Sequence, residues 1–367
     1  MKDKSFINSY GLFSTIIVTV VGVGVFAFPS RLASEVGTDG WLITLASGAI
    51  TYFLLYLIYK IEKINDYNNF YSILNNNFGD IMSKIFSIFF ATYTIYSVAI
   101  GMRIFSEVIK MYLLNNTPTE FILIVMILTG VYLVRGDLKA LIKFNEVCFW
   151  LMFIPVIFVL FFATRGGDFT NILPLMTHKP MNYIVALTNS TYSFAGFEMA
   201  YLIFPFASNK EKIPKVMKWS MIFITLFYTI VMILCLAFFT EKHLRTLLWP
   251  TITLIRAIVI PGAFIERWEG IIMAIWVIFY FTTFVNFYYF AADTLKHAFN
   301  LGDVKVSSLL AVPFIYLIAL YPDNIVELYT FESKVTPIFS LIIFIVLPLL
   351  LLMLGRSRRR RRVQDEV

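Results

Sequence analysis

Charged residues are scarce in this chain, and cysteine and histidine are nearly absent. Only 14% of the 367 residues are Asp, Glu, Lys or Arg, whereas a soluble domain carries about 25%. The two cysteines, Cys148 and Cys235, both fall inside apolar runs, and neither has a Cys or His nearby at metal-ligand spacing. These deficits exclude an ordinary soluble protein and a disulfide-stapled scaffold. They also leave no catalytic or metal-ligating set, so we expect neither an enzyme nor a cofactor.

The chain is rich instead in long apolar runs, since 59% of its residues are hydrophobic. Each run of about 20 apolar residues is long enough to cross a membrane as a helix. The sequence therefore predicts an all-α polytopic membrane protein with ten transmembrane helices, and residues 1–8 offer no cleavable signal. The ten predicted spans lie at about residues 9–34, 40–60, 81–114, 120–134, 141–163, 182–207, 216–240, 267–295, 307–322 and 335–354.

The net charge of +7 is concentrated in loops and at the C-terminus. The run Arg356 and Arg358–Arg362 directly follows the last apolar span, which is typical of a cytoplasmic tail facing anionic lipid rather than of a nucleic-acid patch. Most other Lys and Arg residues fall on the same side if the N-terminus is cytoplasmic. We therefore expect both termini, including the basic tail 355–367, to be cytoplasmic.

The predicted spans form two similar halves within a single transmembrane domain. Spans one to five cover about residues 9–163 and spans six to ten about 182–354, and each half opens with a helix interrupted by glycine. Paired interruptions of this kind indicate an inverted-repeat transporter fold with its binding site at the interruptions. The alternative is that these glycines only allow close helix packing.

The first interruption lies in Val20–Pro29, where Gly22 and Gly24 allow the backbone to leave helical geometry. A broken helix leaves N–H and C=O groups unpaired, and a membrane tolerates them only in protein or in a cavity. Such groups suit the carboxylate and the ammonium of an amino acid. Candidate ligand contacts here are Val21, Gly22, Val23 and Gly24.

The second interruption lies in Thr191–Glu198. Candidate ligand contacts in it are Ser193, Phe194, Ala195, Gly196 and Glu198. A carboxylate near mid-span is costly, so Glu198 is interpreted either as a ligand or gating group or as a structural hydrogen-bonding group.

Polar residues in three other segments are further candidates. In span three, Tyr96, Arg103 and Glu107 share a helix face, and the Arg103–Glu107 pair is either an outer gate or plain packing. In span eight, Thr282, Thr283 and Asn286 either line the cavity or bond to a neighbouring helix. Tyr96 and Asn286 are taken as cavity-wall candidates. The segment Thr251–Ile260 is too short to cross and could cover the outer mouth or rest on lipid.

Gly22–Pro29 and three further blocks of sequence carry a resemblance to a known family. Gly22–Pro29 looks like the first broken helix of amino acid–polyamine–organocation (APC) permeases. The more specific blocks resemble the permease-like B subunits of bacterial spore germinant receptors (GerAB-type spore germination proteins), and the resemblance covers about residues 5–355. These blocks are Ala33–Leu42 with its Gly37-x-Asp39-x-Trp41 pattern, Asn171–Leu175 leading to Phe194–Glu198, and Phe264–Glu269 leading to Trp276.

The resemblance implies a LeuT-like fold of five plus five helices in the inner spore membrane, with the first and sixth helices broken. It implies assembly with the A and C subunits of the same receptor, and sensing of a small nutrient, typically an amino acid, that triggers germination. It places the ligand at Gly22–Gly24 and Ser193–Gly196, with Glu198 beside it.

Two other functions stay open at this stage: a secondary amino-acid transporter of the APC superfamily, and a scaffold whose cavity binds nothing. Proton-coupled APC transporters often carry a lysine midway along span five, whereas Trp150–Phe158 here holds no ionisable group. That difference favours a sensor over a proton-driven transporter.

Overall fold

The computed structural model describes residues 5–258 and 268–355, and these residues are almost entirely helical. The first half contains two short helices in line and then five more. Their bounds are α1 (Ser9–Val20), α2 (Gly24–Val36), the 3₁₀ turn η1 (Gly37–Asp39), α3 (Gly40–Ile64), α4 (Phe70–Phe78), α5 (Asp80–Tyr112), α6 (Thr119–Val134) and α7 (Leu138–Ala163).

The second half also opens with an interrupted helix. Its elements are η2 (Phe169–Ile172), α8 (Pro180–Tyr192), η3 (Phe197–Met199), α9 (Ala200–Ile203), η4 (Phe204–Phe206), η5 (Lys210–Lys212), α10 (Ile213–Leu244), α11 (Pro250–Ala257), α12 (Trp268–Ala298), α13 (Val304–Leu320) and α14 (Ile325–Ser340). A π-helical turn, Leu341–Val346, carries the last helix on to Gly355.

Local sequence signals explain where several helices begin. The Asn8 side chain accepts a hydrogen bond from Gly11 N at 2.6 Å and caps α1, and Asn324 caps α14 in the same way. Pro180 opens α8 at a position where its missing N–H costs nothing. These caps fix the boundaries more sharply than the apolar pattern alone.

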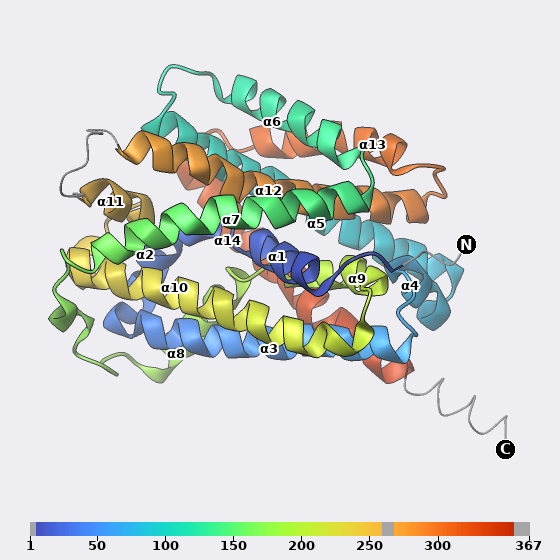
Figure 1. The fold of residues 1–367 in the computed structure, drawn as a ribbon, viewed down its shortest axis with the longest axis horizontal. Coiled ribbons are helices and arrows are strands. Elements are labelled where there is room, and N and C mark those ends of the chain that lie inside the picture. The colour runs from blue at the N-terminus through green and yellow to red at the C-terminus, as the bar shows by residue number, and fades with distance from the viewer. Residues whose placement is uncertain (1–4, 259–267, 356–367) are drawn as a thin grey trace.

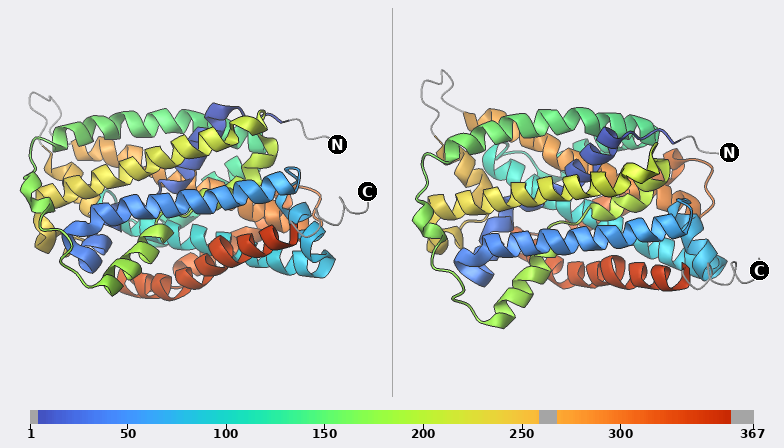
Figure 2. Two further views of the ribbon diagram at one scale, coloured as in Figure 1. Left: turned by 90° about the horizontal axis from the view of Figure 1, so that it is seen from below. Right: turned by 60° about the horizontal axis from the view of Figure 1, so that its bottom comes forward.

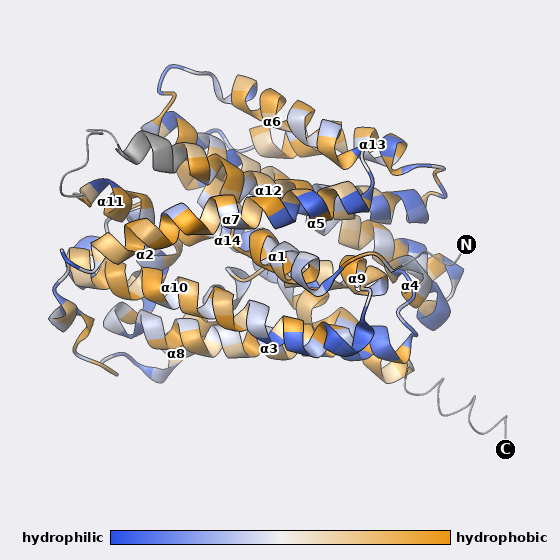
Figure 3. Cartoon of the chain, in the orientation of Figure 1, coloured by the Kyte–Doolittle hydropathy of each residue, from blue (hydrophilic) through white to orange (hydrophobic). Residues whose placement is uncertain are grey.

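The outer surface of the bundle is apolar, as expected for contact with lipid. Tyr132 and Leu128 of α6 are 85% and 65% exposed, although both are large and apolar or aromatic. Within residues 5–258 and 268–355, six helices are long and apolar enough to cross a membrane, and the shorter apolar helices are α1, α6, α13 and the segment Phe197–Phe206. Figure 3 shows this apolar colour along the helix bodies and polar colour at their ends and connections.

The ten predicted spans are confirmed as helices or as broken pairs of helices, so the sequence prediction of the fold class is correct. The pairs α1/α2 and α8/α9 are the two broken helices. Long helices lie side by side around them, α5 against α12 and α3 against α10, and α8 runs beside α3 (Figures 1 and 2). We call the end that holds η1 and α11 the outer end and the end that holds α4 the inner end, following the predicted topology.

Candidate functional site

The first broken helix is interrupted at Val21–Val23. Helix α1 ends at Val20, and Val21 has non-helical backbone angles (φ −83°, ψ 85°) before α2 begins at Gly24. Gly22 approaches α12 so closely that a Cβ atom there would lie 2.6 Å from Thr283 Oγ1. Gly24 differs, because a Cβ atom there would have no neighbour within 4 Å. The backbone at Gly24 therefore faces open space.

The second broken helix is interrupted at Ser193–Gly196. Gly196 has a φ of +116°, a region that side-chain-bearing residues rarely adopt. A Cβ atom there would also lie 3.0 Å from the carbonyl oxygen of Thr19 on α1. The two interruptions therefore touch each other through the backbone, and glycine is required at this contact.

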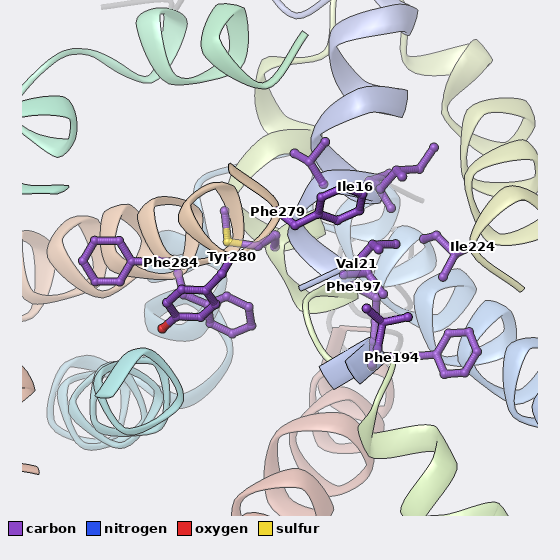
Figure 4. Packing of buried hydrophobic residues seen from close by; sticks show 14 of the residues in the cluster. Ile16, Val21, Phe194, Phe197, Ile224, Phe279, Tyr280 and Phe284 are labelled. Atoms are coloured by element: carbon purple, nitrogen blue, oxygen red, sulfur yellow. The ribbon is translucent and has the colours of Figure 1, made fainter. Parts of the chain in front are cut away.

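Side chains from α10 and α12 hold the two interruptions together. The buried Tyr228 hydroxyl lies 3.3 Å from both Val20 O and Ser193 O, one from each broken helix. Thr283 Oγ1 donates to Thr19 O at 3.1 Å. Figure 4 shows Val21 and Phe194, one from each interruption, on the same side of the view as Ile224 of α10, and Tyr280 and Phe284 of α12 on the opposite side.

A cavity of about 630 Å³ begins at the interruptions and reaches the exposed residues Arg31 and Ser34 toward the outer end. Its deep part is mostly apolar and aromatic. The lining residues used below are Val20, Gly22, Val23, Gly24, Phe28, Gly101, Tyr192, Ser193, Ala195, Tyr280, Thr283, Phe284 and Phe287 in the deep part, and Arg31, Glu35, Asn189, Tyr329 and Glu332 in the outer part.

Charge is arranged unevenly along this cavity. Among the lining residues, every ionisable side chain other than tyrosine belongs to the outer part, where Arg31 of α2 pairs with Glu332 of α14 at 2.7 Å. The Arg31 guanidinium also lies 4.9 Å from the Tyr329 ring centre. This ion pair joins two helices at the outer end of the cavity.

Glu198 lies behind the second interruption rather than in the cavity wall. Its carboxylate is fully buried and accepts hydrogen bonds from Gly196 N at 2.8 Å and from the Tyr93 hydroxyl at 2.6 Å. The carboxylate thus occupies the N-terminal end of the inner half of this helix, where helix dipoles favour negative charge.

The inner end below the interruptions is closed by backbone contacts and by a polar cluster. Phe6 N and Ile7 N both donate to Phe206 O at 3.0 Å, and Ser208 N donates to Ile7 O at 2.8 Å. Asn145 donates to Asn286 at 2.9 Å, and Asn286 donates to Thr19 Oγ1 at 2.8 Å. These bonds fasten the inner halves α1 and α9 and join α1 to α7 and α12.

The predicted ligand contacts divide into two groups. Gly22, Val23, Gly24, Ser193 and Ala195 line the cavity. The others lie outside its lining and stay predictions as ligand contacts: Val21, Tyr96, Phe194, Gly196, Glu198 and Asn286. Phe194 is buried in the core, and the Tyr96 hydroxyl bonds to Thr336 Oγ1 at 3.1 Å. Thr283 both lines the cavity and bonds to α1.

Arg103 and Glu107 form the predicted pair at 3.0 Å, but neither lines the cavity. Arg103 also donates to Ala319 O of α13 and to Asp323 O after it, so the pair fastens α5 to the end of α13 and to the α13–α14 connection. Helix α11 packs on α2, where Thr251 Oγ1 donates to Val25 O at 2.8 Å, and it does not enter the lining either. The predicted segments 264–267 and 356–362 lie outside the described residues.

Arg31, Glu332 and Tyr228 help to shape this site but were not among the residues predicted from the sequence. Arg31 and Glu332 are 301 positions apart, and Tyr228 sits in an uninterrupted apolar run. The only available signal was for Arg31 and Glu35, whose spacing of four places two charges on one face at the end of an apolar span.

Comparison with solved structures shows a transporter fold. A Na⁺-coupled sialic acid symporter in a substrate-bound outward-open state aligns with a TM-score of 0.63 over 92% of this chain and 77% of its own, at 12% identity. The nucleobase-cation-symport-1 family transporter Mhp1 aligns with a TM-score of 0.63 over 94% of this chain and 79% of its own, at 12% identity.

Comparison of sequences shows the family. Spore germination protein A2 of Bacillus subtilis (strain 168) is 26% identical over 355 residues, covering 96% of both chains. Spore germination protein GerQB of Bacillus cereus is 26% identical over 369 residues, covering 97% of this chain and 98% of its own. The family model described as "Spore germination protein" matches residues 6–328. The chain therefore belongs to the spore germination protein family.

Proposed function

We propose that this protein is the B subunit of a nutrient germinant receptor, and that it binds a small amino acid at the two helix interruptions to trigger germination. One observation supports this most directly. The backbone at Gly24 faces a cavity, at the N-terminus of a half-helix, with no side chain in the way. A half-helix N-terminus of this kind binds carboxylates.

The ligand carboxylate is proposed to bind at α2. No hydrogen bond from Val23 N or Gly24 N is found within the described residues, and both residues line the cavity. The corresponding end of the second broken helix is not available, because Glu198 already accepts the hydrogen bond from Gly196 N. The Glu198 carboxylate would also repel a second carboxylate there.

The ligand ammonium is proposed to lie at the other side of the cavity. Helix α8 ends at Tyr192, so its carbonyl groups and the negative end of its dipole point toward Ser193 and Ala195, which line the cavity. The deep wall around this position is formed by Phe28, Tyr280, Phe284 and Phe287. An aliphatic or aromatic neutral side chain fits this wall better than a charged one.

Within this proposal, the protein lies in the inner spore membrane, and the A and C subunits of the same receptor respond to its change of conformation. Both termini are cytoplasmic, and the Arg356–Arg362 tail contacts anionic lipid. The ligand shifts the receptor between two states by binding one of them more tightly.

A binding assay on the purified receptor complex tests the proposal. Each of the common L-amino acids, radiolabelled, is offered to the wild type and to Gly24→Leu, which fills the open space beside the α2 N-terminus. We expect at least one neutral amino acid to bind the wild type, and we expect Gly24→Leu to weaken that binding by about tenfold or more.

The matched control is Gly302→Ala, because a Cβ atom there also meets nothing within 4 Å but Gly302 lies in the α12–α13 connection, away from the cavity. Its binding should equal that of the wild type. Equal binding by Gly24→Leu and the wild type would reject the site, and the absence of binding to the wild type would reject the proposal.

The fold of the solved neighbours supports one other function, a secondary amino-acid transporter. It predicts that the protein alone, in liposomes, accumulates an amino acid when an ion gradient is applied. Uptake of this kind would favour the transporter, and binding without uptake would favour the receptor.

A further inference from the structure

Asp39, in the Gly37–Trp41 block, is fully buried although it is charged. It stands at the N-cap position of α3, where an aspartate usually bonds to the first turn of its own helix, but its side chain makes no such bond. The carboxylate instead accepts Met176 N at 2.9 Å and the Tyr183 hydroxyl at 2.7 Å. Its partners therefore lie in the other half of the chain.

Those partners belong to the second broken helix. Tyr183 is part of α8, and Met176 lies in the connection that leads into it. Met176 has a φ of +57°, which is uncommon for a residue with a side chain, and the hydrogen bond to Asp39 stabilises it there. The Thr38 hydroxyl donates to Pro174 O in the same connection.

The Asp39 and Thr38 contacts come from η1, the turn between α2 and α3, and a second set of contacts joins α2 itself to α8 through Glu35. Asn182 of α8 donates to Glu35 O at 3.2 Å, and Asn189 donates to Glu35 Oε1 at 2.5 Å. The outer halves α2 and α8 are thus joined directly through Glu35 and also through the contacts of η1. The inner halves are bound separately, by the Phe6 and Ile7 contacts with Phe206. Between outer and inner halves lie the two non-helical interruptions.

We propose that Asp39 is a positioning residue that fastens the corner between α2 and α3 to α8, so that the outer halves of the two broken helices move as one unit when the cavity opens or closes. Its effect on nutrient binding rests on the proposed function, whereas its effect on helix position does not. A charged acceptor is suited to this task, because hydrogen bonds to a buried carboxylate are stronger than those to a neutral group.

Distances between spin labels test the proposal without any ligand. A label on an exposed residue of α2 would enter the cavity, so α2 itself is not labelled. One label is placed at Leu45→Cys, near the start of α3, and the other at Ile184→Cys on α8, since both residues are exposed. Cys148 and Cys235 are replaced by alanine. A reference pair at Tyr132→Cys and Ile157→Cys, on α6 and α7, reports any general loosening of the fold.

We expect Asp39→Ala to broaden the Leu45–Ile184 distance distribution about twofold, because a helix freed from its contact samples larger collective motions. Tyr183→Phe, which removes one of the bonds, should broaden it less. The matched control is Asp168→Asn, since Asp168 lies in the same connection and its side chain bonds, within the described residues, only to Thr170, whose hydrogen bonds lower the pKa of Asp168. That variant should leave both distributions unchanged.

An unchanged Leu45–Ile184 distribution in Asp39→Ala would overturn the proposal, and so would equal broadening of the reference pair. If Asp39→Ala does not fold, Tyr183→Phe, which removes the hydroxyl donor to Asp39, takes its place and the same outcomes apply. The bound amino acid should bind Asp39→Ala about tenfold more weakly, since fewer molecules are in the binding state. Selective broadening together with no binding to the wild type would keep the role of Asp39 and reject the nutrient site.

Discussion

At the scale of single residues, the two interruptions use glycine in three different ways. Gly22 lets α12 approach, Gly196 adopts a left-handed backbone against α1, and Gly24 leaves space open to the cavity. Only Gly24 can accept a side chain without disturbing a neighbour. A substitution at Gly24 is expected to change ligand binding alone, whereas a substitution at Gly22 or Gly196 also changes the stability of the fold.

The first prediction separates these roles by stability. Gly196→Ala should lower the free energy of unfolding by about 1–3 kcal/mol, because alanine is strained at φ +116° and meets Thr19 O. Gly24→Ala should change it by less than about 0.5 kcal/mol. Thermal unfolding of both variants in the same detergent measures the difference, and equal unfolding temperatures would contradict the prediction.

The second prediction concerns the buried carboxylate of Glu198. Tyr93→Phe removes one of its two hydrogen-bond donors and should destabilise the protein by about 1.5–3 kcal/mol. The matched control is Tyr52→Phe, since no hydrogen bond of the Tyr52 hydroxyl is found within the described residues. If the two variants unfold at the same temperature, the hydrogen bond from Tyr93 to Glu198 does not stabilise the protein.

The positions of the two helix interruptions could be predicted from the sequence, because glycine is a residue type that permits them. Gly22 and Gly24 mark an interruption because glycine is the residue that permits one, and Ser193 and Ala195 lie beside the second glycine. Tyr228 could not be found in this way. Its hydroxyl acts at the interruptions only because α10 packs there, and no local pattern records that packing.

At the scale of helices, the outer end of the cavity is bounded by one ion pair between α2 and α14. The Arg31 and Glu332 side chains are 46% and 21% exposed, so water screens the pair and it adds at most about 1 kcal/mol to stability. We therefore expect its main effect to be on access to the cavity rather than on unfolding.

The third prediction tests that effect by thiol labelling. A cysteine at Gly24→Cys faces the cavity, whereas the native Cys148 and Cys235 are buried and give little background. Adding Arg31→Gln should increase the rate at which an impermeant thiol reagent modifies position 24, because the contact between α2 and α14 is lost. The control, Arg165→Gln, alters an outer-loop arginine outside the cavity lining. An unchanged rate in Arg31→Gln would show that the pair does not limit access.

Most transmembrane helices were predictable because they are apolar runs bounded by a charge, a proline or a glycine. Helix α4 was not predicted, because it is short, rich in asparagine and falls between two predicted spans. The contacts between helices were not predictable. Arg103 and Glu107 pair within one helix, as spacing predicts, but their role depends on the α13–α14 connection that Arg103 contacts. Spacing along one helix shows which residues share a face, and it does not show what that face meets.

At the scale of the whole molecule, the fold places polar groups at the two ends of the bundle and along the outer part of the cavity. The described residues begin at the inner end, where Phe6 contacts Phe206, and the last described helix ends there too, where Gly355 lies near Asn65 and Asn77. Because both of these ends lie on the same side of the bundle, the chain crosses the membrane an even number of times, as the ten predicted spans require.

The fourth prediction is the membrane orientation. The exposed Met176, before α8, should react with an impermeant maleimide in intact cells when it is changed to cysteine. Asn300→Cys, in the α12–α13 connection, should react only after the membrane is permeabilised. The reverse pattern would place the termini outside.

Germination of spores on single amino acids tests the central claim most directly. Spores carrying the wild-type protein, Gly24→Leu or Gly302→Ala are compared at equal receptor abundance, and loss of refractility is followed for each amino acid. The account predicts that the wild type and Gly302→Ala respond to the same neutral amino acid and that Gly24→Leu needs at least about tenfold more of it. An equal response by Gly24→Leu would contradict the claim that the nutrient binds at the helix interruptions.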